Sequence, residues 1–450
     1  MSDPSTSMPQ GWRAAVTASL RDLRALEPAE QRAALASFAF FFCVLCSYYI
    51  IRPLRDEMGV TVGTDGLQRL FVIVFVVMLA AVPVFGWLVS RLPRPRVAPA
   101  VYAFFAANLL AFWGALSKGG ISPALAATFF VWVSVFNLFV VSLFWIVMSD
   151  LWSSDQAKRL YGLIAAGGSA GAFCGPLVTQ SLVHVLSPTN LLLVSAGILG
   201  LAGLLAAILA ARAPRMPHDA PHAPTALRDV LAGATHVVRS PFLLKIAAWV
   251  LLANLISTFF YFEQARVVGS VLTERSDRVQ LFARMDLASN ILTVAGQVFV
   301  TGALLQRLGV GLAAAAVPAV AIAGLSALAI SPTLWVLVVI IVAERAVGFA
   351  FSNPAMRVLY TVVSPEEKYK AQSFIDTVVF RGGDAASGWL LNGVAKTLGA
   401  ATATVALLTL PFAAAWLLVS LTLGRAHQRL ADPTHEPAHA AAPDGTPAQP

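Results

Sequence analysis

The feature of this sequence that most constrains its fold is the recurrence of long apolar windows separated by short polar breaks. We count twelve such windows in the 450 residues. About 20 mainly apolar residues in a helix are enough to cross the hydrocarbon core of a bilayer. The approximate cores are 34–51, 70–89, 97–116, 124–148, 160–182, 191–209, 242–262, 284–305, 310–330, 334–351, 371–394 and 401–423. These windows predict an all-α polytopic membrane protein with twelve transmembrane helices.

The distribution of charge predicts how the chain is oriented. Only 12% of the residues are charged and mean hydropathy is +0.75, whereas soluble chains carry about a quarter charged residues. The net charge of +8 follows the membrane and gives no reason to expect a nucleic-acid partner. If the N-terminus is cytoplasmic, 20 Lys and Arg residues fall in inner segments and 9 in outer ones. The excess predicts that both termini are cytoplasmic, in a bacterial cytoplasmic (inner) membrane.

The longest central polar break divides the windows into six and six. It predicts a cytoplasmic N-terminal segment at 1–33, a first six-helix half at 34–210, a cytoplasmic central loop at 211–241 and a second half at 242–424. Residues 425–450 end in a stretch rich in Ala, Pro and His that cannot bury a core, and they predict a disordered cytoplasmic tail. The first 33 residues contain no apolar stretch typical of a cleavable signal peptide.

The two halves match each other in sequence at a nearly constant offset. The segment Gly86 to Arg91 follows the second window, and Gly302 to Arg307 follows the eighth, and both pairs of end residues differ by 216. A register held across several windows indicates an internal duplication. Two parallel halves of six helices are typical of transporters that rock about a central site.

The segment from Gly86 to Arg96 resembles the loop signature of the major facilitator superfamily, G-x-L-a-D-r-x-G-r-k. The family's Asp is replaced by Ser90 in this copy and by Gln306 in the second. The resemblance implies two six-helix halves that expose a central site alternately to each side. It also implies a basic gating loop, whose residues here are Gly86, Arg91, Arg94 and Arg307.

Charged and amide residues inside the windows are the candidates for ion or proton coupling. A charge in hydrocarbon costs at least about 2.5 kcal/mol, so it usually faces a partner or a watery cavity. Asp286, Asn290 and Gln297 fall on one helix face. The alternative is that such residues lock helices together, as Glu344 with Arg345 or as Arg381 with Asp384. The predicted coupling residues are Asp286, Glu344, Arg345, Asp376, Arg381 and Asp384.

Aromatic residues and arginines together predict a binding site for a small anion. They cluster at the end of the first window, and the seventh window carries the cognate group. Guanidinium groups recognise anions, and aromatic rings support cations and flat ligands. The alternative is that they are interfacial anchors. The predicted substrate-binding residues are Tyr48, Tyr49, Arg52, Arg55, Tyr261, Glu263, Arg266 and Asn290.

The run from Ile51 to Asp56 also resembles, more narrowly, the span-one signature I-L-R-x-x-K-D of the ATP/ADP translocases of plastids and intracellular bacteria. The segment 144–161 is similar to the fourth loop of that family. This resemblance implies a nucleotide-like exchanger. The fourth window departs from the family, because it has Val133, Ser134 and Asn137 where the family has an acidic residue.

Two further motifs predict packing. Gly167, Gly171 and Gly175 recur at helical spacing, and small residues four apart let helix backbones approach closely. Cys43 and Cys46 have the spacing of a redox motif but lie in an apolar window, which predicts buried core residues.

The motifs of other functional classes are missing from the sequence. It contains no H-E-x-x-H and no G-x-x-x-x-G-K-[ST] loop. We therefore expect no enzyme activity, cofactor or metal. The predicted partners are a small-molecule substrate, the lipid bilayer and a coupling proton or counter-substrate. The alternatives are a drug/proton antiporter of the same superfamily, a membrane-embedded enzyme and a sensor.

Overall fold

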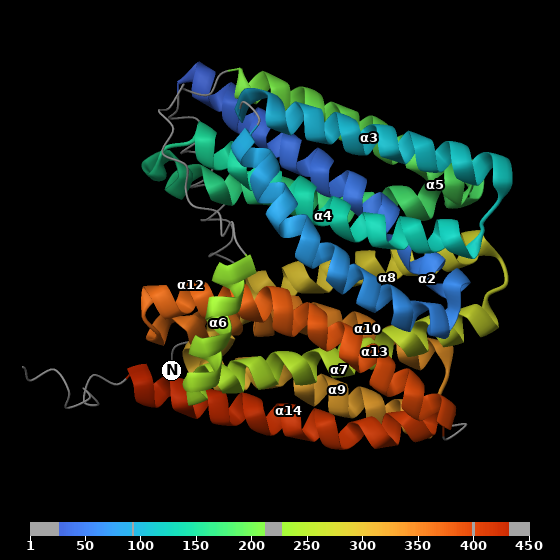
Figure 1. The fold of residues 1–450 in the computed structure, drawn as a ribbon, viewed down its shortest axis with the longest axis vertical. Coiled ribbons are helices and arrows are strands. Elements are labelled where there is room, and N and C mark those ends of the chain that lie inside the picture. The colour runs from blue at the N-terminus through green and yellow to red at the C-terminus, as the bar shows by residue number, and fades with distance from the viewer. Residues whose placement is uncertain (1–26, 92–93, 212–226, 398–400, 432–450) are drawn as a thin grey trace, which may run out of the picture.

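The computed structural model describes residues 27–91, 94–211, 227–397 and 401–431, and their regular structure is helical throughout (Figure 1). Eight stretches are long and apolar enough to cross a bilayer. The helices are α2 (Pro28–Arg91), α3 (Arg94–Gly119), α4 (Pro123–Leu151), α5 (Ser154–Ala210), α6 (Leu227–Arg239), α7 (Pro241–Val271), α8 (Arg275–Gly296), α9 (Gly302–Ile330), α10 (Leu334–Val347), α11 (Asn353–Leu359), α12 (Pro365–Phe374), α13 (Phe380–Thr397) and α14 (Thr402–Ala431). Short π or 3₁₀ turns continue several of them: η1 (Gln297–Thr301), η2 (Gly348–Ser352), η3 (Tyr360–Val362) and η4 (Ile375–Val379).

Three of these helices contain a break. Gly63 in α2, Ser187 in α5 and Gly309 in α9 have φ values of 76°, 67° and 79°. A positive φ interrupts a right-handed helix, and glycine adopts it without steric cost. Figure 1 shows the two limbs of α2 on either side of its break in dark and lighter blue. Each of the predicted windows falls on helix, apart from residue 401, which immediately precedes α14.

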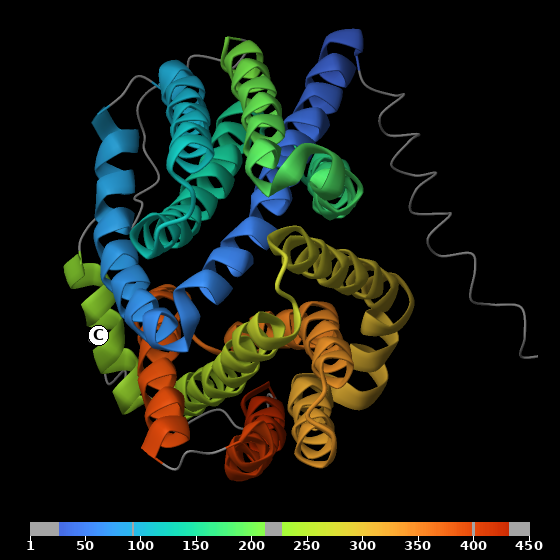
Figure 2. The same cartoon turned by 90° about the vertical axis from the view of Figure 1, so that its right-hand side faces the viewer.

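The helices form two groups, α2–α5 and α7–α14, which lie one above the other in Figures 1 and 2. Each group has its own hydrophobic core. The rings of Phe40 and Phe144 meet at 5.0 Å in the first core, and those of Trp249 and Trp416 meet at 5.3 Å in the second. The sequence offset recurs in the helix boundaries, since α3 begins at Arg94 and α9 resumes after its break at Val310, 216 residues later.

The helices define two sides of the bundle. We call the end where α2 begins, α14 ends and α6 lies the terminal side (Figure 1). The other end, where the chain turns at Gly63, Gly120 and Ser187, is the opposite side. A polar residue can therefore be placed by its position along its helix.

Three segments are more helical than the sequence analysis expected. The predicted central loop contains α6, which packs against α12 and α7. α14 continues to Ala431, beyond the predicted start of the tail at residue 425. At the other end of the chain, α2 begins at Pro28 rather than at 34. The rest of the predicted N-terminal segment, central loop and tail lies outside the described residues.

The glycine stripe of α5 is a packing surface, as predicted. A methyl group on Gly167 would clash with the carbonyl oxygen of Phe38, and one on Gly171 would clash with that of Phe42. A methyl group on Gly175 would lie 2.8 Å from the carbonyl oxygen of Cys46. The stripe and its partners advance together by four residues, so the backbones of α2 and α5 lie in close contact over two turns.

Candidate functional site

A charged cavity of about 460 Å³ lies within the α7–α14 group and is reached by one side chain of the first group, Arg52 of α2. Cavities of roughly 300–1,000 Å³ hold small ligands. Helices α7, α10 and α13 supply most of the polar wall. The polar lining residues are Arg52, Asn254, Ser257, Tyr261, Gln264, Glu344, Arg345, Ser352, Asn353 and Asp384.

Two arginines of this wall converge on one buried carboxylate. Nη1 of Arg52 lies 3.0 Å from Oδ1 of Asp286, and Nη1 of Arg345 lies 3.1 Å from the same oxygen. Asp286 is only 1% exposed, and its second oxygen accepts no hydrogen bond from the described residues. A buried charge needs such partners, because desolvation costs several kcal/mol per ion. The cluster joins the two helix groups and carries one positive charge in excess.

Glu344 does not pair with its neighbour, so that alternative from the sequence is wrong. Arg345 turns to Asp286, while Oε1 of Glu344 accepts a hydrogen bond of 2.8 Å from Ser257 Oγ. Within the part of the chain that the structure describes, no basic group lies at ion-pair distance from Glu344. Glu344 is therefore a carboxylate at the cavity wall that forms no ion pair with a described residue.

Arg55 is held away from the cavity. Helix α2 continues through Pro53, which places Arg55 one turn beyond Arg52. Nη1 of Arg55 lies 3.4 Å from Asp56 Oδ1, and its guanidinium lies 4.1 Å from the centre of the Phe130 ring. The hydroxyl of Tyr261 donates to Asp56 Oδ1 at 3.0 Å, which links α7 to α2.

Tyr48 and Tyr49 support this region without lining the cavity. Their ring centres are 5.3 Å apart, and the guanidinium of Arg52 lies 5.6 Å from the centre of the Tyr49 ring. Tyr49 also contacts the glycine stripe at Gly175. The two tyrosines are therefore placed to orient Arg52.

Glu263 and Arg266 pair with each other nearer the opposite side. Their charged atoms are 2.9 Å apart, and Thr402 Oγ1 donates to Glu263 at 2.6 Å. Arg266 borders a separate surface hollow with Asp65 and Lys396. This pair connects α7 to α14 and does not line the cavity.

The predicted polar stripe on α8 splits between different contacts. Asp286 enters the arginine cluster, whereas Nδ2 of Asn290 donates to the carbonyl oxygen of Ala172 on α5 at 2.7 Å. Gln297 donates to the carbonyl oxygen of Phe349 at 3.2 Å, at the start of the π turn η1. A π turn adds a residue to the helical repeat, so it changes the register. Neither amide lines the cavity.

The charged residues predicted for coupling in the window 371–394 also lie in different surroundings. Arg381 and Asp384 are 3.9 Å apart, and Asp384 lines the cavity. Asp376 is exposed in the π turn η4 and does not line it.

The predicted gating residues lie near helix ends on the terminal side. Gly86 and Arg91 belong to the last turns of α2, and Arg307 lies two residues before the break in α9 at Gly309. Arg91 and Arg307 are exposed. Arg94 begins α3, and its side chain lies outside the described residues.

A second ion cluster, which the sequence analysis did not single out, joins the two helix groups on the opposite side. Glu57 of α2 is fully buried, with Arg275 Nε 2.8 Å from Oε2 and Arg278 Nη2 3.1 Å from Oε1. Lys396 Nζ lies 2.6 Å from Asp65 Oδ1 nearby. The signal was Glu57 beside Arg55 and Asp56, but a charge near a window end has no partner readable from one sequence.

Several polar contacts between the helix groups lie at the centre and on the opposite side. They include the clusters of Asp286 and Glu57, the amide of Asn290 and the hydrogen bond from Asn392 to Gln68. These contacts hold the two groups together at the centre and on this side.

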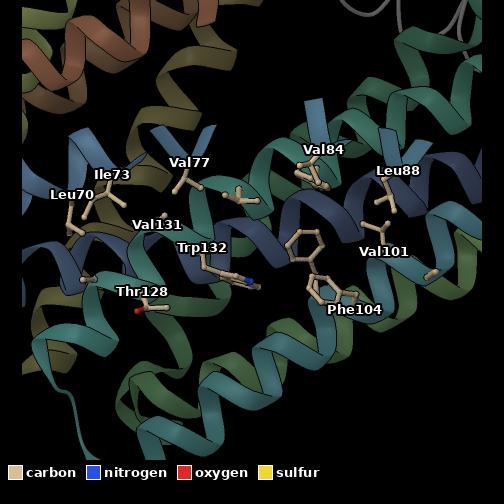
Figure 3. Close-up of a pocket in the computed structure, with 15 residues that line it drawn as sticks. Leu70, Ile73, Val77, Val84, Leu88, Val101, Phe104, Thr128, Val131 and Trp132 are labelled. Atoms are coloured by element: carbon tan, nitrogen blue, oxygen red, sulfur yellow. The ribbon is translucent and has the colours of Figure 1, made fainter. Parts of the chain in front are cut away.

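Another cavity, of about 790 Å³, has the wrong chemistry for a charged ligand. It is a groove between α2, α3 and α4, and its labelled lining is almost entirely apolar (Figure 3). Ile73, Val84 and Phe104 are 46%, 54% and 60% exposed there. Such a surface suits lipid chains. We therefore assign the candidate site to the smaller, charged cavity.

The apolar helices and the charged cavity, which lies within the second helix group and is reached by Arg52 of the first, are typical of an integral membrane transport protein. Residues 33–388 match the family model of the Major Facilitator Superfamily, and the chain belongs to this family. The broader resemblance seen in the sequence is thereby confirmed. The family and the structural relatives are transporters, which argues against an enzyme.

Solved structures of similar fold are transporters. An auto-inhibited POT family peptide transporter has a TM-score of 0.61 at 14% identity, covering 93% of this chain and 99% of that one. The nucleoside transporter NupG has a TM-score of 0.61 at 14% identity, with coverages of 88% and 99%. A bacterial homologue of the human lysosomal transporter Spinster, inward-facing and unoccupied, gives 0.54 at 13%, with coverages of 90% and 98%. No curated protein matches the chain in sequence.

Proposed function

We propose that this protein is a secondary active transporter of twelve transmembrane helices, which moves a small anionic solute by alternating access. The observation that supports this proposal most directly is the ion cluster at the cavity wall. In it, Arg52 of one helix group and Arg345 of the other contact the same carboxylate, that of Asp286. This cluster joins both helix groups and borders the cavity. A solute that binds in the cavity and changes the cluster therefore affects both groups. The cluster is the position at which binding and rocking are most directly linked.

The arginines favour an anion. Both contact the same oxygen of Asp286, so one carboxylate serves two guanidinium groups, each of which has five N–H donors. The remaining donors face a site that can accept a carboxylate or phosphate oxygen. An anion bound there competes with Asp286 for the two arginines.

Asp286 then becomes the coupling residue. When the arginines turn to the substrate, its buried carboxylate loses partners, and a buried carboxylate without partners takes up a proton or repels the solute. The sequence has no nucleotide-binding loop, so a gradient or a counter-substrate supplies the energy. A nucleotide-like exchanger is the narrower form of this proposal, and it rests on the resemblance of Ile51 to Asp56 to the ATP/ADP translocases.

The excess of basic residues on the terminal side supports a cytoplasmic location for both termini, in a bacterial inner membrane. With this orientation, the buried Glu57 cluster joins the two helix groups on the periplasmic side.

The proposal is tested by thermal shift of the purified protein against carboxylates, organic phosphates, nucleotides and lipophilic cations. We expect anions to stabilise the protein, because ligand binding raises the midpoint of unfolding. Uptake of the stabilising solute into proteoliposomes should then require a proton gradient or internal counter-substrate. Stabilisation by lipophilic cations alone would favour the drug/proton antiporter instead.

A further inference from the structure

We infer that the substrate is a zwitterion, whose protonated amine is bound by Glu344 and Asp384 while its anionic group is bound by Arg52 and Arg345. This inference rests on the proposed function of the same cavity and narrows its substrate class. In addition to the anionic group that the arginines bind, the substrate then carries a cationic group, which the arginines alone would not predict.

The charges around the cavity are balanced. Arg52 and Arg345 line it, and so do Glu344 and Asp384. Just behind this wall, Asp286 serves the two arginines and Arg381 lies 3.9 Å from Asp384. In formal charge the three basic and three acidic groups cancel. A purely anionic solute would bring an unbalanced charge into this enclosed site, whereas a solute with both charges would not.

Glu344 is the acidic group of the wall without an ion-pair partner among the described residues. It lies on α10 after an apolar run and directly before Arg345, whose guanidinium pairs with Asp286 instead, and it accepts a hydrogen bond from the neutral hydroxyl of Ser257. A carboxylate in a membrane helix needs a cation or a proton. An ammonium group entering the cavity supplies the cation and up to three N–H donors.

Asp384 adds a second acceptor on the facing helix α13. Its contact with Arg381, at 3.9 Å, is at the long limit for an ion pair, so the carboxylate is incompletely satisfied. Asn254 and Ser257 of α7 line the wall as well and offer further hydrogen bonds. An amine is a better ligand for this acceptor-rich wall than a second anion.

The position of Glu344 next to Arg345 limits the size of the substrate. The two side chains follow each other on α10 and turn to different partners, Ser257 and Asp286. The groups that bind the amine and the anion are therefore neighbours in one helix turn. This arrangement suits a compact molecule whose amine and carboxylate are separated by a few bonds.

Glu344 has one other role open to it, which is to carry only the coupling proton. The two roles differ in what they do to binding. Loss of an amine contact weakens binding of the amine-bearing solute alone. Loss of a proton carrier reduces gradient-driven accumulation of every substrate and leaves equilibrium affinities in place.

The experiment compares probes that differ in one charge. Purified wild-type protein is titrated with free amino acids and dipeptides, their N-acetylated forms and their C-terminal amides, and affinities are taken from thermal shifts. We expect the zwitterions to bind at least tenfold more tightly than either blocked form. Glu344→Gln should remove most of this advantage over the N-acetylated form, without changing the affinity for the N-acetylated form itself.

Two further variants serve as controls for Glu344→Gln. Glu344→Asp retains the charge and should restore part of the preference, and Asp277→Asn, at a half-exposed site outside the cavity, should leave it unchanged. If Glu344→Gln does not fold, Asp384→Asn, which removes the other carboxylate of the proposed amine site, takes its place. N-acetylated anions that bind as tightly as zwitterions would overturn the inference and leave the proposed function standing. Binding of none of these solutes or of any other anion would overturn both.

Discussion

Asp286 is the residue on which the central cluster depends. Arg52 and Arg345 approach it at 3.0 and 3.1 Å from different helix groups, and it is almost fully buried. Without its charge, two guanidinium groups would lie close together with no carboxylate between them. Loss of one partner from a buried ion cluster typically costs about 3–5 kcal/mol.

Replacement of Asp286 by Asn should therefore lower transport at least tenfold. The amide keeps the size of the side chain but cannot balance the arginines or take up a proton. Initial uptake rates in proteoliposomes measure the effect, with Asp286→Glu as the variant that retains the charge. Asp277→Asn, whose only described ion-pair partner is His184, is the matched control. Transport by Asp286→Asn at the wild-type rate would remove Asp286 from the mechanism.

The sequence predicted which charged residues belong to the site better than it predicted which residues they contact. A charge in an apolar window is visible in the sequence, so Asp286, Glu344 and Asp384 were all identified. Their partners were not identified, because Arg345 contacts Asp286, 59 positions away, and forms no ion pair with the adjacent Glu344. Neutral lining residues such as Asn254 and Ser257 were missed, since amides and hydroxyls occur in membrane helices for packing as well as for binding.

At the scale of helices, the α2–α5 contact sets the shape of the first group. The carbonyl oxygens of α2 lie where side chains on the glycine stripe would be. Substitution of Gly171 by Ala should lower the unfolding midpoint by several degrees, because overpacking costs about 1–3 kcal/mol. Gly197→Ala is the matched control on the same helix, where an added methyl meets nothing within 4 Å. Equal midpoints for the two variants would contradict the packing role.

Helix α2 also carries the contact that fastens the opposite side. Glu57→Gln leaves Arg275 and Arg278 without their shared carboxylate, so this side should open more often. A cysteine at Ala253, which lines the cavity, reports the opening in a chain whose native cysteines are replaced by alanine. An impermeant maleimide added on the side of Gly120 should label it several-fold faster in Glu57→Gln.

Asp65→Asn is the control for this labelling experiment. Its pair with Lys396 joins the same two helix groups, but both side chains are more than half exposed. Exposed pairs contribute at most about 1 kcal/mol, so labelling should change less than twofold. Equal labelling in wild type and Glu57→Gln would show that the buried cluster does not hold this side closed.

The helices themselves followed closely from hydropathy, whereas their ends and joints did not. Apolar windows mark where chain can lie in lipid, and each fell on helix. A hydropathy window does not register a residue at positive φ, so it was not foreseen that Gly63 and Ser187 would mark the breaks in α2 and α5. Helix α6 was missed for another reason. Residues 227–239 form an amphipathic helix, with one polar and one apolar face, so their average hydropathy is low and a search for apolar windows does not find them.

For the whole molecule, the sequence offset near 216 indicated two related halves, and the structure places helices in two groups with separate cores. What one sequence does not contain is the relative position of these groups, which depends on side-chain contacts between residues hundreds of positions apart. The hydrogen bond of Asn392 to Gln68 joins residues 324 positions apart. Such contacts define the conformation that the structure presents.

A transporter that works by alternating access must break the contacts of the opposite side in every cycle. Gln68 and Asn392, whose side-chain atoms are 2.5 Å apart, are suited to a test by double replacement with cysteine. Cross-linking them with a short bifunctional thiosulfonate should abolish transport, a reducing agent should restore it, and either single-cysteine variant should be insensitive. Thermal stabilisation by substrate should survive the cross-link, because neither cross-linked residue lines the cavity. Undiminished transport in the cross-linked protein would mean that solute crosses without separation of these helices, as it does in a channel.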